Sequence, residues 1–174
     1  MSQRIVQIIS GRLSLRSPQR ESLESLQKAI AATPDILHPN RDVPALLEIL
    51  KTEFPTLSDF ERDFPSLCFA LATGVGKTRL MGAFISYLHL AHGISNFFVL
   101  APNLTIYNKL IADFTPNTKK YVFRGIAEFA VNTPKIVTGD DYEVKAIAKT
   151  IDNNREMPSP IYETGNFFSF PKST

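Results

Sequence analysis

The segment that most constrains this chain is residues 71–78, which read LATGVGKT and place two glycines before a lysine and a threonine. The apolar run at 67–70 in front of it is short and continuous, as in a strand buried on both faces. Behind it, apolar residues recur at helical spacing and a stop signal follows, at Leu80, Met81, Phe84, Ile85, Leu88 and Gly93. The order predicts a buried strand, a glycine loop and a helix.

A glycine loop between a buried strand and a helix N-terminus is a place where anions bind. Glycines allow backbone conformations that a side chain would forbid, so that consecutive N–H groups point at one anion. The positive end of the helix dipole adds to this attraction. We therefore predict nucleotide phosphate binding by Thr73, Gly74, Val75, Gly76, Lys77 and Thr78. Lys77 would reach the β- and γ-phosphates and the Thr78 hydroxyl would join the Mg²⁺ shell, which makes both the candidate catalytic residues.

The loop departs from the general phosphate-loop rule at one position. The pattern G-x-x-x-x-G-K-T asks for glycine at position 71, where this chain has Leu71. A plain glycine turn is the alternative, and the predicted strand and helix on either side favour phosphate binding.

The form Ala-Thr-Gly-x-Gly-Lys-Thr resembles motif I of superfamily-two helicases and translocases. It is most similar to the motor subunits of type III and type I restriction enzymes. The resemblance implies an α/β fold, an incomplete RecA-like phosphate-loop NTPase lobe with a parallel sheet flanked by helices. It also implies ATP and Mg²⁺ as cofactors and double-stranded DNA as a partner through backbone contacts.

A helix is predicted to begin near Ser17 as N-cap, with Pro18 in its first turn, and to end at Thr33. The segment 15–19, Leu-Arg-Ser-Pro-Gln, resembles the element that precedes motif I in restriction-type motors. The resemblance makes Arg16 and Gln19 candidate nucleotide-binding residues, with the Gln19 amide recognising adenine, since it offers one donor and one acceptor. The alternative is that Gln19 is an exposed first-turn residue. Before this helix, residues 5–9 are predicted to form a short strand.

A second strand is predicted at residues 97–101 and a second helix at 104–114. Alternating strands and helices predict right-handed parallel crossovers. Val-Leu-Ala-Pro-Asn followed by a helix resembles motif Ia of the same motors, which implies that Pro102, Asn103 and Thr105 contact the DNA backbone. The alternative is an ordinary helix cap, for which Asn103 is well suited.

Composition agrees with a globular domain, since 44% of the 174 residues are hydrophobic and 21% are charged. The net charge of +2 is too small to indicate nucleic-acid binding by itself. Four arginines precede any acidic residue, namely Arg4, Arg12, Arg16 and Arg20, and they fit a basic patch and a solvated face equally. A single cysteine, Cys68, and the lack of a long apolar run favour a cytoplasmic protein with no membrane partner.

Residues 1–152 are predicted to form the N-terminal part of a helicase-type ATP-binding domain, with residues 34–66 as an insertion that contains a helix at 42–54. Short strands are predicted at 121–123 and 135–138, with a helical turn at 124–129 between them. From residue 153 the composition changes and periodicity disappears. Residues 153–174 are therefore predicted to be an irregular, disordered tail.

In the superfamily-two motors that this sequence resembles, hydrolysis needs an Asp-Glu pair after motif Ia, and this sequence has none. The segment Gly139-Asp140-Asp141 does not match such a pair. A second lobe is also missing. The resemblance therefore predicts an ATP-binding, DNA-binding fragment of a restriction-type helicase subunit that is inactive by itself. The parent would couple ATP hydrolysis to movement on DNA and cleavage, with a DNA methyltransferase or specificity subunit as a possible partner. The alternatives are a small phosphate-loop kinase and a nucleotide-gated binding protein.

Overall fold

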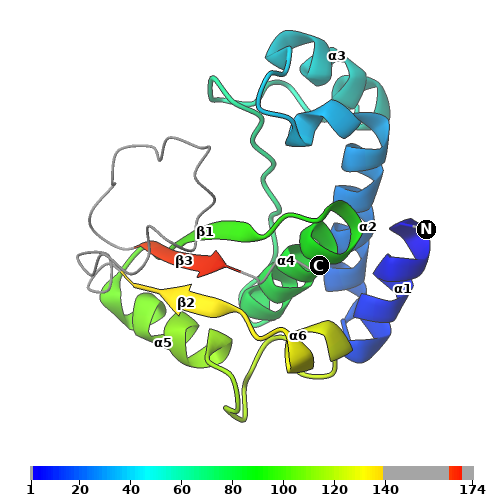
Figure 1. The fold of residues 1–174 in the computed structure, drawn as a ribbon. Helices are drawn as coiled ribbons and strands as arrows, with labels where there is room; N and C mark the ends of the chain where they lie inside the picture. Colours follow the sequence, from blue (N-terminus) through cyan, green and yellow to red (C-terminus); the bar gives the residue numbers. More distant parts are fainter. Residues whose placement is uncertain (1, 139–164, 170–174) are drawn as a thin grey trace. The chain divides into compact units, whose positions relative to one another are not determined.

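The computed structural model describes residues 2–138 and 165–169, the latter as backbone. The chain divides into two compact units, Met1–Tyr87 and Leu88–Thr174. Their boundary falls within the helix α4 (Lys77–His92), which follows the glycine loop (Figure 1). Each unit is therefore described by itself.

The first unit begins with α1 (Ser2–Arg12), which packs on α2 (Ser17–Ala32). The strand predicted at residues 5–9 is wrong, because this segment lies inside α1. Its inward residues Val6 and Ile9 are buried, as is Leu13 just beyond the helix. These positions are three and four residues apart, which is the spacing of a helix face and not of a strand.

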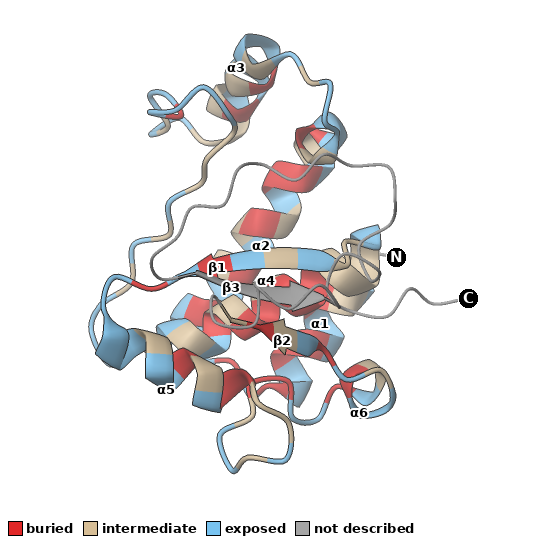
Figure 2. Ribbon diagram, turned by 60° about the vertical axis from the view of Figure 1, so that its left-hand side comes forward, coloured by how far each residue is buried: buried red, intermediate tan, exposed pale blue. Residues whose placement is uncertain are grey.

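The helix α2 confirms the predicted start and end to within one residue. Arg16 takes the N-cap position that was assigned to Ser17, and the chain leaves the helix at Thr33. Buried positions recur along its length (Figure 2), and they include Leu23, Leu26 and Ile30. This apolar stripe anchors the helix whose first turn faces the glycine loop.

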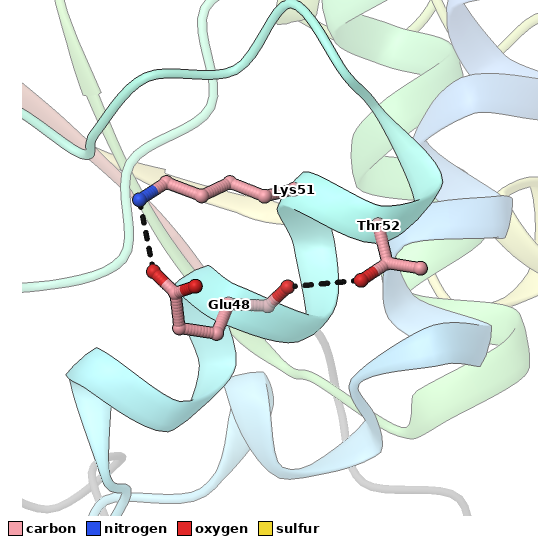
Figure 3. A network of polar contacts seen from close by, with 3 residues as sticks. All are labelled: Glu48, Lys51 and Thr52. Atoms are coloured by element: carbon pink, nitrogen blue, oxygen red, sulfur yellow. Dashed lines mark hydrogen bonds and ion pairs between the residues drawn. The ribbon is translucent and has the colours of Figure 1, made fainter.

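Between α2 and the loop lie the 3₁₀ helix η1 (Pro34–Leu37) and α3 (Val43–Glu53), and α3 confirms the helix predicted at residues 42–54. The Asp42 carboxylate accepts a hydrogen bond from the Ala45 N–H at 3.1 Å and so caps α3. Figure 3 shows a local network on this helix, in which the Lys51 ammonium pairs with Glu48 at 2.9 Å and the Thr52 hydroxyl donates to the Glu48 carbonyl at 3.2 Å. Such exposed pairs contribute little to stability.

The strand predicted at residues 67–70 is wrong in this structure. Residues 65–72 have no regular secondary structure, and Cys68, expected in the core, is exposed. A strand needs a neighbour for its backbone hydrogen bonds. The three described strands pair among themselves, and the Phe69 ring packs against Phe84 of α4 with centroids 4.7 Å apart.

The second unit contains a sheet of three strands, β1 (Asn96–Leu100), β2 (Lys135–Val137) and β3 (Gly165–Ser169), in the order β1-β3-β2. Both outer strands are antiparallel to β3, with Phe98 opposite Phe167 and Ile136 opposite Phe168. β1 and β2 therefore run in the same direction, but a parallel pair of neighbours, as predicted, is not formed within the described residues.

The strand β3 lies in the segment that was predicted to be irregular. Its two adjacent phenylalanines favour extended backbone, and five residues are too few to give a clear periodic signal. The remaining residues of the predicted tail, and Asp140 and Asp141, lie outside the described part of the chain.

The core of the second unit is aromatic. The Phe123 ring lies edge-on to Phe114, with centroids 5.4 Å apart, and 4.6 Å from Phe129. These residues come from the loop before α6 (Ala127–Val131), the end of α5 (Leu104–Phe114) and α6 itself. Residues 122–125 form turns, so the strand predicted at 121–123 is wrong; the chain reverses at Gly125, where φ is +98°.

Candidate functional site

The glycine loop has the backbone that its sequence predicts. Gly74 and Gly76 have φ angles of +82° and +94°, in the left-handed region that side chains rarely adopt. Thr73, Gly74 and Gly76 are exposed, and Val75 is half-buried. The loop therefore presents its backbone to solvent directly before a helix.

The helix α4 begins at Lys77 with no acidic residue in its first turn. The exposed Lys77 and Arg79 place two positive charges at the positive end of the helix dipole. Cations at a helix N-terminus oppose the dipole, whereas a bound anion would satisfy both the dipole and the cations. The electrostatics of this turn favour an anion.

The Lys77 side chain turns back across the loop. Its ammonium donates to the Ala72 carbonyl at 3.4 Å, and the Val75 N–H donates to the same oxygen at 3.5 Å. Lys77 and Thr78 thus stand on the first turn of α4, where the phosphate motif requires them.

Residues 2–138 contain no group of three or more His, Cys, Asp or Glu side chains that would hold a metal ion. A Mg²⁺ ion here would be held by Thr78 and by oxygens of the phosphates.

The structure brings Gln19 onto the glycine loop from 57 residues away in the sequence. Its side-chain NH₂ donates to the Gly76 carbonyl at 2.9 Å, and its side-chain oxygen accepts from the Arg16 N–H at 2.8 Å. Gln19 is 1% exposed, so the alternative of an exposed first-turn residue is wrong. The Arg16 side chain is exposed. A Gln at the third position of a helix signals the bond to Arg16, but no sequence signal indicated the bond to Gly76.

The second unit carries the residues predicted to contact DNA. Pro102, Asn103 and Thr105 are exposed, at the junction of β1 and α5. The Asn103 side-chain oxygen accepts from the Ile106 N–H at 2.9 Å, which confirms Asn103 as the N-cap of α5. Its capping role leaves the side-chain NH₂ as the donor for another acceptor.

A comparison with protein-family models decides the family of this chain. Residues 12–158 match the model described as type III restriction enzyme, res subunit. The chain belongs to this family. The match covers the Gln19 turn, the glycine loop and the Asn103 cap, and it confirms the resemblance drawn from those segments. No curated protein and no solved structure matches the chain.

Membership of the type III restriction enzyme res subunit family implies a helicase-like domain with a RecA-like phosphate-loop fold. Domains of this family generally use ATP with Mg²⁺ and generally bind DNA. Within the described ranges of this chain, none of the helices has the length and apolar character needed to span a membrane.

Proposed function

We propose that this chain binds ATP with Mg²⁺ at residues 73–78, as the nucleotide-binding part of a restriction-type helicase subunit. One observation carries the proposal: two exposed glycines with positive φ lead directly into a helix that starts with Lys77 and has no acidic residue in its first turn. Backbone N–H groups, Lys77 and the Thr78 hydroxyl together fit the phosphates of a nucleotide and its metal ion.

The phosphates, rather than the base, should dominate the affinity. Isothermal titration of the full chain in the presence of Mg²⁺ is expected to give much tighter binding for ATP than for AMP, by about 100-fold or more, since two additional phosphates meet charged donors. Adenosine bound as tightly as ATP would contradict a phosphate site and would favour a pocket for the base.

We also propose that Pro102, Asn103 and Thr105 contact the backbone of double-stranded DNA. The helix N-terminus of α5 and the exposed NH₂ group of Asn103 support phosphate contacts that carry no sequence information. Such contacts should weaken as salt increases.

The substitution Asn103→Asp separates DNA binding from helix capping. Aspartate caps a helix as well as asparagine does, so the melting temperature should stay unchanged, but the new charge should repel a DNA phosphate. Fluorescence anisotropy with a labelled DNA duplex is expected to show affinity reduced by about 5- to 10-fold at low salt. Unchanged affinity would argue against a DNA contact at this residue.

The parent activity that we propose is ATP-driven movement on DNA coupled to cleavage, with a methyltransferase or specificity subunit as partner, in the cytoplasm. The 174 residues of this chain include no Asp-Glu pair that would position the attacking water. We therefore expect the isolated chain to bind ATP and to turn it over slowly or not at all.

A further inference from the structure

We infer that the exposed face of α1 is a second DNA-binding surface, on which Arg4 and Arg12 contact the phosphate backbone of a duplex without reading its sequence. The inference rests on the proposed function for its partner, because double-stranded DNA is the polyanion proposed there. The surface lies in the first unit and shares no residue with either of the two sites proposed above.

The helix α1 buries one face and exposes the other. On the buried side, Val6 and Ile9 are 3% and 0% exposed, and α1 packs on α2. On the opposite side, exposed residues recur at helical spacing, and they are Arg4, Gln7, Ile8, Gly11 and Arg12. At about 1.5 Å per residue, the two arginines are about 12 Å apart along the helix axis. They therefore stand on one exposed face, about two turns apart.

Contacts at both ends hold α1 in place. The Ser2 hydroxyl shares a hydrogen bond of 2.6 Å with the hydroxyl of Tyr87, a residue of α4 that is 1% exposed. At the other end, the Leu15 N–H donates to the Ser10 carbonyl at 2.9 Å, across Ser14 with a φ of +48°. This is the six-to-one bond of a Schellman motif, which closes the helix. The backbone that carries the two arginines is thus ordered before any partner binds, which lowers the entropy cost of binding.

The exposed face of α1 carries charge of one sign. No acidic residue occurs before Glu21 in the sequence, and no ion pair among the described residues includes Arg4 or Arg12. The helix dipole favours Arg12, which stands in the last turn, but it opposes Arg4, which stands in the first. A row of DNA phosphates would supply the negative charge that this helix lacks.

Gly11 leaves the same face open at the level of the backbone. Glycine is unfavourable in a helix relative to alanine, so a glycine there usually has a local reason. The φ of Gly11 is not positive, and nothing lies within 4 Å of a Cβ atom built on it. The packing of the described residues therefore does not require glycine at this position. Its missing side chain lets a DNA strand approach α1 closely beside Arg12.

The composition of this face favours DNA over a membrane or a protein partner. A helix that lies on a membrane inserts its apolar face into the lipid, whereas the apolar face of α1 is buried within the first unit. A protein interface has an apolar or aromatic centre, and the exposed face of α1 offers only Ile8, which is 48% exposed. Arginines with few apolar neighbours are typical of contacts to a phosphate backbone.

The double substitution Arg4→Gln with Arg12→Gln tests the surface in the full chain. Glutamine has nearly the helix propensity of arginine, so the melting temperature should stay unchanged. The matched control is Arg62→Gln with Lys120→Gln, which removes two exposed charges from outside α1. If the double variant fails to fold, Gly11→Glu supplies the test, with Gly11→Gln as its uncharged control. Both residues are better helix formers than glycine, and only the glutamate adds a charge that repels phosphate.

Binding is measured without nucleotide by fluorescence anisotropy, with two labelled duplexes of unrelated sequence over a series of salt concentrations. Loss of two phosphate contacts is expected to reduce the slope of log affinity against log salt by about 2, and the affinity at low salt by about 10-fold or more. The loss should be equal for both duplexes, and Gly11→Glu should bind about 5-fold more weakly than Gly11→Gln. A double variant that keeps the wild-type slope, or that loses no more than the control pair, would overturn the inference.

The same assay separates this inference from the proposed function. Duplex binding lost in the α1 double variant but unchanged in Asn103→Asp would support the inference and contradict the proposed contact at Asn103 alone. The reverse pattern would overturn the inference and leave that contact standing. The double variant should also keep the wild-type affinity for Mg²⁺-ATP, since neither arginine belongs to the nucleotide site. If it keeps duplex binding but loses binding to phosphatidylserine vesicles or polyglutamate, the partner is a membrane or an acidic protein and the inference is overturned.

Discussion

Replacing Lys77 with alanine is expected to weaken ATP binding by about 10- to 100-fold, because one charge-assisted hydrogen bond to phosphate contributes about 1.5–3 kcal/mol. The side chain is exposed, and its long 3.4 Å bond to the Ala72 carbonyl adds little to the fold. The melting temperature should therefore stay close to that of the wild type. The expected loss is therefore one of binding and not of folding.

The measurement is a calorimetric titration of the full chain with Mg²⁺-ATP, accompanied by a thermal melt. Lys120→Ala is the matched control, because it removes an exposed lysine from the other unit and changes the net charge equally. Equal loss in both variants would mean that long-range charge, and not a contact in the loop, attracts the nucleotide. Rapid DNA-stimulated hydrolysis abolished by Lys77→Ala would contradict the expectation that this chain turns ATP over slowly.

Replacing Phe123 with alanine is expected to lower the free energy of unfolding by about 3–5 kcal/mol. Phe123 is 1% exposed, and its ring contacts three other aromatic rings, those of Phe114, Tyr121 and Phe129. Truncation removes these ring contacts together with the buried area, and leaves a cavity that rigid rings fill poorly. A loss of this size is a large fraction of the stability of a small unit.

Urea unfolding followed by circular dichroism measures this change. Val131→Ala is the control, since Val131 belongs to the same unit and is 82% exposed, so its truncation should change stability by less than about 0.5 kcal/mol. A Phe123→Ala variant as stable as Val131→Ala would mean that the aromatic cluster does not hold this unit together.

Helices were predicted well because their signals are local. Pro18, the Leu23–Leu26–Ile30 stripe and Thr33 define α2, while Asn103 defines the start of α5. The apolar residues at positions 5–9, interpreted as a short strand, gave a wrong prediction. The four apolar residues of this segment stand in two adjacent pairs, and such a short pattern fits a buried strand as well as a helix. The burial of Val6 and Ile9 on one face of α1 shows that the helix forms.

Strands were predicted less well because a strand depends on a distant partner. Residues 67–70 have the composition of a core strand, yet without a ladder they leave Cys68 exposed. Residues 165–169 lack a strand pattern, yet their backbone pairs with both β1 and β2. Which segments pair over such distances depends on the whole chain, because the chain between them must close into a loop. A stretch of a few consecutive residues does not contain this information.

By itself, the sequence determined the glycine loop, the helices around it and the family, because glycine conformations, helix caps and motif spacing act within a few residues. The tertiary structure alone decided that Gln19 holds the Gly76 carbonyl. That contact joins residues 57 positions apart, and no local pattern predicts it. The physical reason is that a buried amide must satisfy both its donor and its acceptor, and only the folded chain shows which backbone groups are within reach.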